Sequence, residues 1–167
     1  MEIDALLNYF GVSAQHPAFD ALLATVDLHE RPAFDPEAGN PVELIELHDQ
    51  GLCLEFIKAR MFERYYGIPK DRGAMVFYRV RMFMRMEEDY QPYRGALPLQ
   101  LPSDMTPQEA ATQLGMPSLV RDETDAFGRP NCLEYVWKQV NGLGVFVHFR
   151  KRPPGVAQVI LSPPKIR

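Results

Sequence analysis

The sequence predicts an α+β fold in which two tandem helix–hairpin–strand repeats form an antiparallel sheet, with the helices packed on one face. Three observations predict this fold. The spacing of apolar residues changes from a helical repeat to a two-residue alternation near residue 42. The same order of helix, Gly- and Pro-containing loop, hairpin and strand occurs twice, over about residues 13–86 and 104–162. The hairpin segments 42–52 and 133–143 align without a gap, and Glu, Gly and Leu recur in register.

The first half of the chain contains two predicted helices, a hairpin and a long strand. Residues 3–10 carry apolar side chains at helical spacing, and a second helix is expected to begin near Pro17, because proline fits the first helical turn. Residues 42–48 and 52–57 alternate as the two strands of a hairpin with Gly51 in its turn. Residues 74–86 are predicted to form a third strand.

The second half repeats this order. Thr106 and Glu109 form a predicted capping box at a helix start, and Gly115 ends that helix. Asn141 and Gly142 are the dipeptide most favoured in a two-residue hairpin turn, here between strands 133–140 and 143–149. Residues 156–161 supply a last strand.

Composition limits the kind of protein. The 167 residues, 46% hydrophobic and 24% charged, are typical of a single globular domain spanning 1–167. The acidic start lacks the basic region of a secretory signal, and no apolar stretch suits a membrane helix, so we expect a cytoplasmic protein with no membrane partner. Cys53 and Cys132 have no metal-type spacing, and neither a metal nor a cofactor is expected.

Charge is distributed unevenly along the chain. Residues 1–57 hold eleven carboxylates and one arginine, whereas the net charge of the whole chain is only −4. This net charge argues against a nucleic-acid partner, because phosphate binding needs concentrated positive charge. The acidic first third could steer a basic protein partner, but a solvated acidic helix face is the favoured explanation.

Strand alternation also predicts which side chains lie on the sheet face without helices. Counting outward from the Asn141-Gly142 turn places aromatic, basic and acidic side chains together on that face, a composition typical of protein interfaces. The candidate partner-binding residues are Glu46, His48, Phe77, Arg79, Arg81, Phe83, Arg85, Tyr135, Trp137, Phe146 and His148. The alternative is that these aromatics form a minor core beneath the connection 58–73.

Catalytic interpretations of the sequence are weaker. His48 and Cys53 are expected to share a sheet face, but a nucleophilic pair also needs a short His-to-sulfur distance and an orienting group. His148 alternates with apolar strand residues and fits a structural or interface role. Residues 87–89 are three acidic residues after a strand and are interpreted as a solvated turn. No catalytic residues are therefore assigned.

Three segments resemble a known group of proteins. Residues 93–98 read YRGALP, residues 105–110 read MTPQEA, and residues 114–117 read LGMP. Together they resemble the pattern YxGxLP…xEvxxxLGxP of small bacterial proteins, many of them encoded beside secreted toxins as immunity proteins. The helix, LGxP segment and hairpin are also similar to the repeat of the β-lactamase inhibitory protein fold. The resemblance covers about residues 13–162, but residues 99–101 read LQL where the group usually has Gly after Leu-Pro.

The resemblance implies a cytoplasmic immunity protein that binds a cognate protein toxin and inhibits it stoichiometrically, without chemistry of its own. Trp137, Tyr135 and Phe146 are the expected anchors, so Trp137→Ala should weaken binding and leave folding nearly intact. The alternative function is a small-molecule-binding module or an unrecognised enzyme with a pocket between the sheet and residues 58–73. An envelope scaffold is a third possibility, disfavoured by the missing signal.

Overall fold

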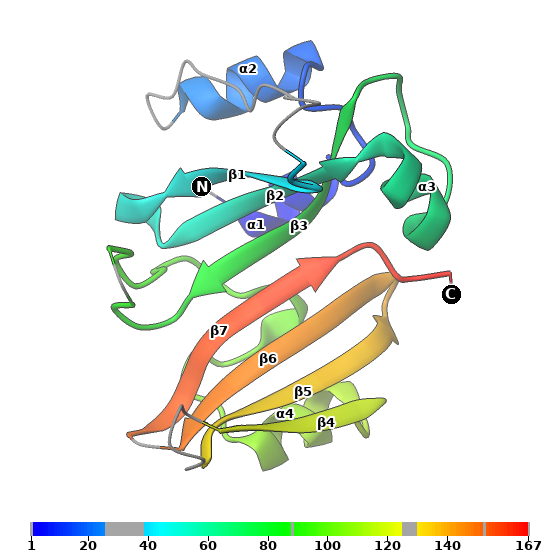
Figure 1. Ribbon diagram of the computed structural model, residues 1–167. Helices are drawn as coiled ribbons and strands as arrows, with labels where there is room; N and C mark the ends of the chain where they lie inside the picture. The colour runs from blue at the N-terminus through cyan, green and yellow to red at the C-terminus, as the bar shows by residue number, and fades with distance from the viewer. Residues whose placement is uncertain (1, 26–38, 88, 125–129, 152, 167) are drawn as a thin grey trace.

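A seven-stranded antiparallel sheet dominates the computed structural model, which describes residues 2–25, 39–87, 89–124, 130–151 and 153–166 (Figure 1). The strand order is β1-β2-β3-β7-β6-β5-β4. The strands are β1 (Val42–Leu47), β2 (Leu52–Lys58), β3 (Met75–Phe83), β4 (Leu119–Thr124), β5 (Pro130–Val140), β6 (Leu143–Lys151) and β7 (Pro154–Ser162). The helices are α1 (Ile3–Leu7), α2 (Pro17–Ala24), α3 (Ala59–Tyr66) and α4 (Pro107–Leu114), with single 3-10 turns at His48–Gln50 and Pro98–Gln100.

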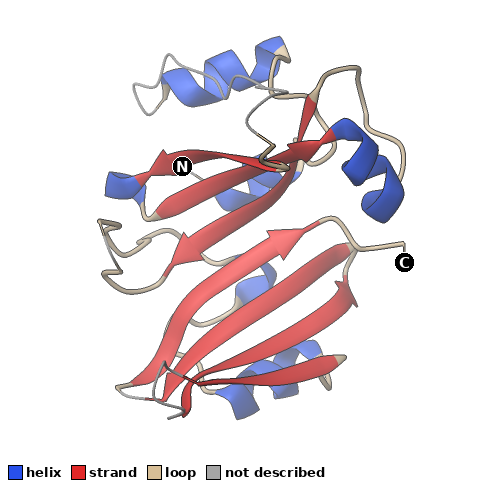
Figure 2. Cartoon of the chain, viewed as in Figure 1, coloured by secondary structure: helices blue, strands red, loops and turns tan. Residues whose placement is uncertain are grey.

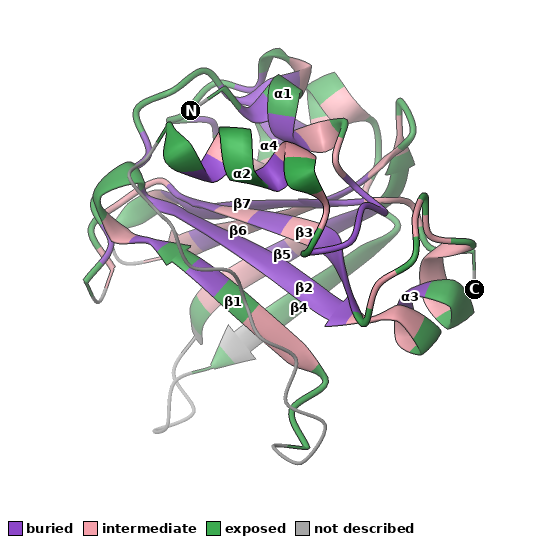
Figure 3. Ribbon diagram, turned by 90° about the horizontal axis from the view of Figure 1, so that it is seen from above, coloured by how far each residue is buried: buried purple, intermediate pink, exposed green. Residues whose placement is uncertain are grey.

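The predicted α+β class and antiparallel sheet are confirmed, but only three of the four described helices lie on one face. Helices α1, α2 and α4 lie on one face of the sheet, as the view along its edge shows (Figure 3). Their apolar side chains join those of the strands in one main core, in which Leu6 and Phe19 are wholly buried against strand residues such as Phe56 and Phe77. The rings of Phe19 and Phe77 meet edge to face at 5.6 Å between centroids. This core fixes the helix-covered face.

The centre of the sheet is the pairing of β3 with β7. Four residue pairs, from Val80 with Leu161 to Phe83 with Gln158, join strands from distant parts of the chain. On one side of this seam lie β1 and β2, and on the other lie β6, β5 and β4. The seam therefore makes one continuous sheet of strands from the two halves of the sequence.

Turns and caps follow the sequence closely. Asn141 and Gly142 both have positive φ, +49° and +80°, as a two-residue hairpin turn of type I′ requires. Thr106 and Glu109 form the predicted capping box, and helix α4 ends at Gly115 with φ +83°. Gly51 turns the first hairpin at φ +65°, where an added Cβ would lie only 2.3 Å from the carbonyl oxygen of Gln91.

Two elements were not predicted. Helix α3 lies between β2 and β3, on the face opposite the other helices (Figure 2). Its Phe62 packs with Ile57, Val76 and Tyr78 in a second, smaller core. Strand β4 extends the sheet beyond β5 and forms its edge. The smaller core thus occupies the space between the sheet and α3, where the alternative function placed a pocket.

A β-bulge overturns part of the predicted face assignment in β3. Glu55 pairs with Arg79, but the next residue, Phe56, pairs with Phe77, so Tyr78 is an extra residue in β3. The bulge puts Tyr78 and Arg79 on the same face and turns Phe77 into the main core, where it is wholly buried. Phe77 was predicted on the helix-free face, and that prediction is wrong.

A second β-bulge, in β5, also overturns part of the predicted face assignment. Val140 pairs with Leu143 as the turn requires, yet Trp137 pairs with Val145, which adds a residue to β5 between them. Trp137 and Tyr135 therefore belong to the main core with Val145 and Val147. The prediction that these two rings lie on the helix-free face is wrong, and the bulge is the physical reason.

The YxGxLP segment has a structural role. Tyr93 and Leu97 belong to the main core, and a Cβ on Gly95 would lie 2.1 Å from the Tyr93 hydroxyl oxygen. Leu101 and Met105, farther along the same connection to α4, are also buried in that core. These residues pack the connection between β3 and α4 onto the main core, so the motif has a role in folding.

Candidate protein-binding face

The sheet face opposite α1, α2 and α4, here called the open face, carries most of the polar side chains of the strands. Helix α3 covers only one end of it (Figure 1). The strand residues that point to this face include Leu44, Glu46, Cys53, Glu55, Tyr78, Arg79, Arg81, Phe83, Glu134, Val136, Phe146, His148, Gln158 and Ile160.

Glu55 is the centre of a cluster on β2 and β3. The Tyr78 hydroxyl donates to Glu55 Oε2 at 2.9 Å, and Arg79 Nη1 donates to the same oxygen at 3.0 Å. Arg81 donates from Nε and Nη2 to Glu55 Oε1, at 3.2 and 2.8 Å. The Glu55 side chain is only 4% exposed, whereas that of Arg81 is 33% exposed. A buried carboxylate therefore holds two partly exposed guanidinium groups in position on the open face.

The protonation of this cluster follows from its geometry. Burial acts to lower the pKa of Arg79, but the Glu55 carboxylate, together with the neighbouring Tyr78 and Tyr66, raises that pKa above its usual value. Burial also raises the pKa of Tyr78, and the nearby Glu55 contributes to the increase. Arg79 thus stays charged and Tyr78 stays a hydrogen-bond donor over the physiological range.

Further ion pairs continue across β5, β6 and β7. Gln158 Nε2 donates to Glu87 Oε2 at 3.0 Å, and Arg150 Nη2 lies 3.5 Å from Glu87 Oε1. Glu87 is therefore not merely a residue of a solvated turn, as its sequence context predicted. In β5, the nearly buried Glu134 contacts Arg121 at 2.8 Å and His148 Nε2 at 3.1 Å. This pairing gives His148 a polar partner on the open face.

Aromatic side chains border the Glu55 cluster. Phe83 and Tyr90 stack with their centroids 3.9 Å apart, and the His48 ring lies 4.4 Å from that of Tyr90. The Tyr90 hydroxyl donates to Glu46 Oε1 at 2.7 Å. On the other side, the Arg79 guanidinium lies 5.8 Å from the centroid of the Phe146 ring. Rings and charges are therefore interleaved on this face.

The structure divides the predicted partner-binding residues into three groups. On the open face lie Glu46, Arg79, Arg81, Phe83, Phe146 and His148. At its border lie His48, in the turn after β1, and Arg85, which follows β3 and donates to the carbonyls of Pro153 and Pro154. On the helix-covered face lie Phe77, Tyr135 and Trp137.

Sequence reasoning left several open-face residues out of the candidate set. Glu55 was placed on this face by alternation, but nothing in the sequence marked it as the partner of two arginines. Glu134 and Gln158 are polar residues within strands, and that signal could have singled them out, because a buried polar side chain needs partners. Tyr90 and Arg121 come from a loop and an unpredicted strand.

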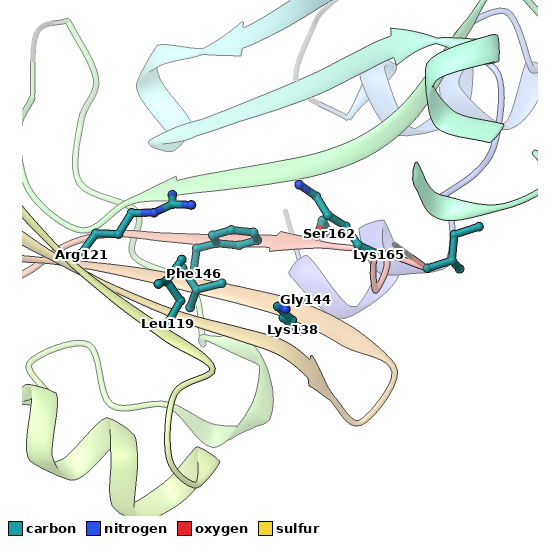
Figure 4. A pocket seen from close by; sticks show the side chains of 9 residues that line it. Leu119, Arg121, Lys138, Gly144, Phe146, Ser162 and Lys165 are labelled. Atoms are coloured by element: carbon teal, nitrogen blue, oxygen red, sulfur yellow. The ribbon is translucent and has the colours of Figure 1, made fainter. Parts of the chain in front are cut away.

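Two hollows indent the open face. One, of about 460 Å³, lies over β1 to β3 and is lined by polar and apolar groups including Leu44, Glu46, Arg81 and Phe83. The other, of about 330 Å³, lies between β4 and the C-terminal tail (Figure 4). Val136 and Phe146 lie among its lining residues. The open face is thus shaped and is not a flat polar sheet.

The Cys53 thiol is poorly suited to nucleophilic chemistry. Burial raises its pKa to about 11, and the negative charge of Glu55 adds to the increase. A thiolate is the reactive form, so at neutral pH Cys53 is a protonated, packed side chain beside Phe83 and Tyr90. The His48 ring packs on Tyr90 in the same region.

We expect Cys53 to resist thiol reagents in the folded protein. With a pKa of about 11, roughly 0.1% of the thiol is ionised at about pH 8. In a Cys132→Ser variant, which keeps Cys53 as the remaining thiol, a chromogenic disulfide reagent should react very slowly until the protein is unfolded in guanidinium chloride. The Cys53→Ser variant is the matched control. Rapid labelling of the folded Cys132→Ser variant would contradict the packing described for Cys53.

Among the residues that the structure describes, no group of three or more His, Cys, Asp and Glu side chains could hold a metal ion. The helices within that same part of the chain are all too short or too polar to cross a membrane.

Comparison with known proteins gives no relative. No protein-family model matches the chain, and no curated protein or solved structure matches it.

Proposed function

We propose that the protein is an immunity protein that binds a cognate protein toxin through the open face and inhibits it by occupying its surface. The observation that carries this proposal is the open face itself, where paired charges and apolar side chains lie together and no described helix covers most of them. Interfaces of this kind combine apolar anchors with a polar surround. The sequence resemblance to immunity proteins points to the same class of partner.

The arginines of the open face are held by carboxylates of the same chain, which supports binding to a protein. Glu55 already holds Arg79 and Arg81, and Glu134 already holds Arg121. A partner that pairs with these guanidinium groups would lose little additional side-chain entropy, because their positions are set before binding. Such charges would select the partner by complementarity.

The anchors differ from those expected from the sequence. Trp137 and Tyr135 lie in the core, so they cannot enter a partner's surface. The apolar side chains offered to solvent on the open face include Leu44, 47% exposed on β1, and Leu119, 39% exposed on β4. Phe146 lies half-buried between them. We propose that these three residues provide the apolar part of the interface.

We also infer that the sheet descends from two related halves. Strands β1, β2 and β3 form one meander and β5, β6 and β7 form another, and the third strands of the two meanders pair at the seam. A helix precedes each meander on the same side of the sheet, namely α2 and α4. Two tandem repeats would produce this arrangement, and an open face built by both halves would follow from it.

Substitutions that preserve folding can test toxin binding. Leu44→Arg and Leu119→Arg each add a cation at an exposed position of the open face, whereas Gln108→Arg adds one on α4, beyond the opposite face. We expect the two open-face variants to bind the toxin encoded by the adjoining gene at least about 10-fold more weakly, which corresponds to about 1.4 kcal/mol. Gln108→Arg should bind normally. Calorimetric titration measures the affinity, and survival of cells expressing the toxin measures inhibition.

Two results would contradict the proposal. One is the absence of both binding and protection when the protein is tested against that toxin. The other is equal binding by all three variants, since it would place the interface away from the open face. Thermal unfolding of each variant shows whether its fold is intact.

A second candidate function is small-molecule binding. The hollow between β4 and the C-terminal tail, about 330 Å³, is within the size range of ligand sites. Its apolar lining residues Leu119, Val136 and Phe146 favour a ligand with an apolar part. Binding of such a ligand by the isolated protein would support this candidate.

A further inference from the structure

The hollow between β4 and the C-terminal tail has an apolar lining with cationic side chains among its walls. Val136 of β5 and Phe146 of β6 contribute apolar surface, and Leu119 and Ile166 do so from the two sides. Figure 4 shows the Phe146 ring between the side chains of Arg121 and Leu119 on one side and Lys165 on the other. An apolar group entering here would meet side chains contributed by β4, β5, β6 and the tail.

The wall formed by the tail is fixed in place. The backbone N–H of Ile166 donates to the carbonyl oxygen of Tyr65 at 2.9 Å, which ties the tail to the end of α3. The Lys165 ammonium lies 5.9 Å from the centroid of the Tyr65 ring. The hollow therefore exists before any ligand binds, and its second wall does not have to be ordered by binding.

The charged residues among the described lining of this hollow are all basic. Its described lining residues include Arg121, Lys138 and Lys165 and contain no aspartate or glutamate. Arg121 is engaged by Glu134 at 2.8 Å, so its charge is largely compensated. Lys138 and Lys165 are both exposed, on strand β5 and on the tail. These two ammonium groups make the hollow attractive to an anion that also has an apolar part.

The hollow is continuous with the rest of the open face. The Phe146 ring, which lines it, lies 5.8 Å from the Arg79 guanidinium of the Glu55 cluster. Ile166, at its rim, is 60% exposed, so an occupant would remain partly uncovered by this chain alone. Small-molecule sites enclose most of their ligand, whereas a protein segment can be covered from its other side by its own fold. These features favour a segment of a protein as the occupant.

We propose that this hollow takes an apolar side chain flanked by carboxylates, from an acidic segment of the partner protein. This inference rests on the proposed function, because it assigns one recognition element to the open face. The apolar side chain packs on Val136 and Phe146, and the flanking carboxylates pair with Lys138 and Lys165. The contact is charge-assisted at an exposed surface, so it weakens as salt concentration rises.

Peptide titration of the isolated protein tests this assignment. The probes are the capped peptides Glu-Leu-Glu-Phe-Glu, Lys-Leu-Lys-Phe-Lys and Glu-Ser-Glu-Ser-Glu, together with decanoate, each added to the isotopically labelled full chain at low ionic strength. We expect the first peptide to shift the backbone amide signals of Val136, Gly144 and Phe146 and to bind at least about 10-fold more tightly than the other two peptides. A Lys138→Glu/Lys165→Glu variant should lose this preference, and Gln108→Glu should keep it.

Each other outcome overturns the assignment. Equal binding of the basic peptide would remove the charge argument, and equal binding of the serine peptide would remove the apolar one. Tight binding of decanoate without binding of the first peptide would make the hollow a small-molecule site. Absence of any shift at the three amides, or an unchanged preference in the Lys138→Glu/Lys165→Glu variant, would show that the hollow is not used.

The toxin itself separates this inference from the proposed function. If the toxin binds the unmodified protein and the Lys138→Glu/Lys165→Glu variant equally well, the proposed function stands and the assignment to this hollow fails. If no toxin binds while the peptide preference is present, the proposed function fails and the hollow remains an anionic-peptide site. Unfolding curves of the variant establish that its fold is unchanged.

Discussion

Trp137→Ala is expected to lower the free energy of unfolding by about 3–5 kcal/mol, the range seen when a large buried aromatic side chain is truncated. The Trp137 side chain belongs to the main core, and the residue is only 2% exposed. Its ring packs with that of Tyr135 at 5.7 Å between centroids. Truncation would leave a cavity beneath α4 that the surrounding strands cannot readily fill.

The indole also makes a polar contact that holds α4 to the sheet. Trp137 Nε1 donates to the carbonyl oxygen of Gly115 at 2.8 Å, and Gly115 is the residue at which α4 ends. That carbonyl is one of the groups left without an intrahelical partner at a helix end. Trp137 therefore packs in the main core with its ring and holds the C-terminal end of α4 with its N–H group.

Chemical denaturation measures this effect, and two variants control it. Trp137→Phe keeps most of the apolar contact and loses the hydrogen bond, so it should cost less than the alanine variant. Leu44→Ala, at a position 47% exposed on the open face, should change the free energy of unfolding by no more than about 0.5 kcal/mol. A Trp137→Ala loss below about 1 kcal/mol would contradict the burial of this ring.

Trp137 was predicted on the open face and lies in the main core, which shows why the sequence predicted the fold more accurately than the candidate site. The prediction counted strand alternation outward from the Asn141-Gly142 turn, and the turn itself forms as expected. The extra residue between Trp137 and Val140 then reverses the alternation for the rest of β5. Turn chemistry sets only the first residue pair, and one bulge is enough to exchange the two faces.

A conflicting signal was present in β5. Glu134 and Lys138 alternate with Leu133, Tyr135 and Trp137, which by itself places the three apolar side chains on the covered face. The amphipathic pattern and the turn register disagree by one residue, and a bulge is the structure that satisfies both. In β3, residues 76–78 are all apolar, so no comparable signal marks the bulge at Tyr78.

Where no bulge intervenes, alternation predicts the face correctly. Across β1 and the first half of β2, Glu46, Cys53 and Glu55 point to the open face as expected, and Leu47 and Leu54 point to the core. The two unpredicted elements are short: α3 has eight residues and β4 has six. Phe62 and Tyr66 lie one helical turn apart, a spacing that could have indicated α3.

The Glu55 cluster places a buried carboxylate beneath two arginines of the open face. Burying a carboxylate is costly unless it is paired and hydrogen-bonded, and Glu55 is paired with Arg79 and Arg81 and also accepts from Tyr78. In return, both guanidinium groups are held in place on the open face. Among the described residues, Arg79 Nε is one buried polar atom without a hydrogen-bond partner. Removing Glu55 would take away the carboxylate that pairs with Arg79.

Glu55→Leu is accordingly expected to destabilise the protein by about 3–5 kcal/mol, because it leaves a mostly buried arginine without its counter-ion. The double variant Glu55→Leu/Arg79→Leu should recover only part of that loss, since it removes the buried Glu55–Arg79 pair but still leaves Arg81 without its carboxylate. Glu46→Gln is the matched control: this carboxylate is exposed and accepts from the Tyr90 hydroxyl, which an amide oxygen can replace.

A double-mutant cycle measured by chemical denaturation distinguishes this account from a simple packing effect. If Glu55 matters through Arg79, the two single variants should together cost more than the double variant. If the losses simply add, the ion pair is not what makes Glu55→Leu destabilising. Should Glu55→Leu cost as little as Glu46→Gln, the carboxylate is not buried as described, and the guanidinium groups on the open face are not held in advance for a partner.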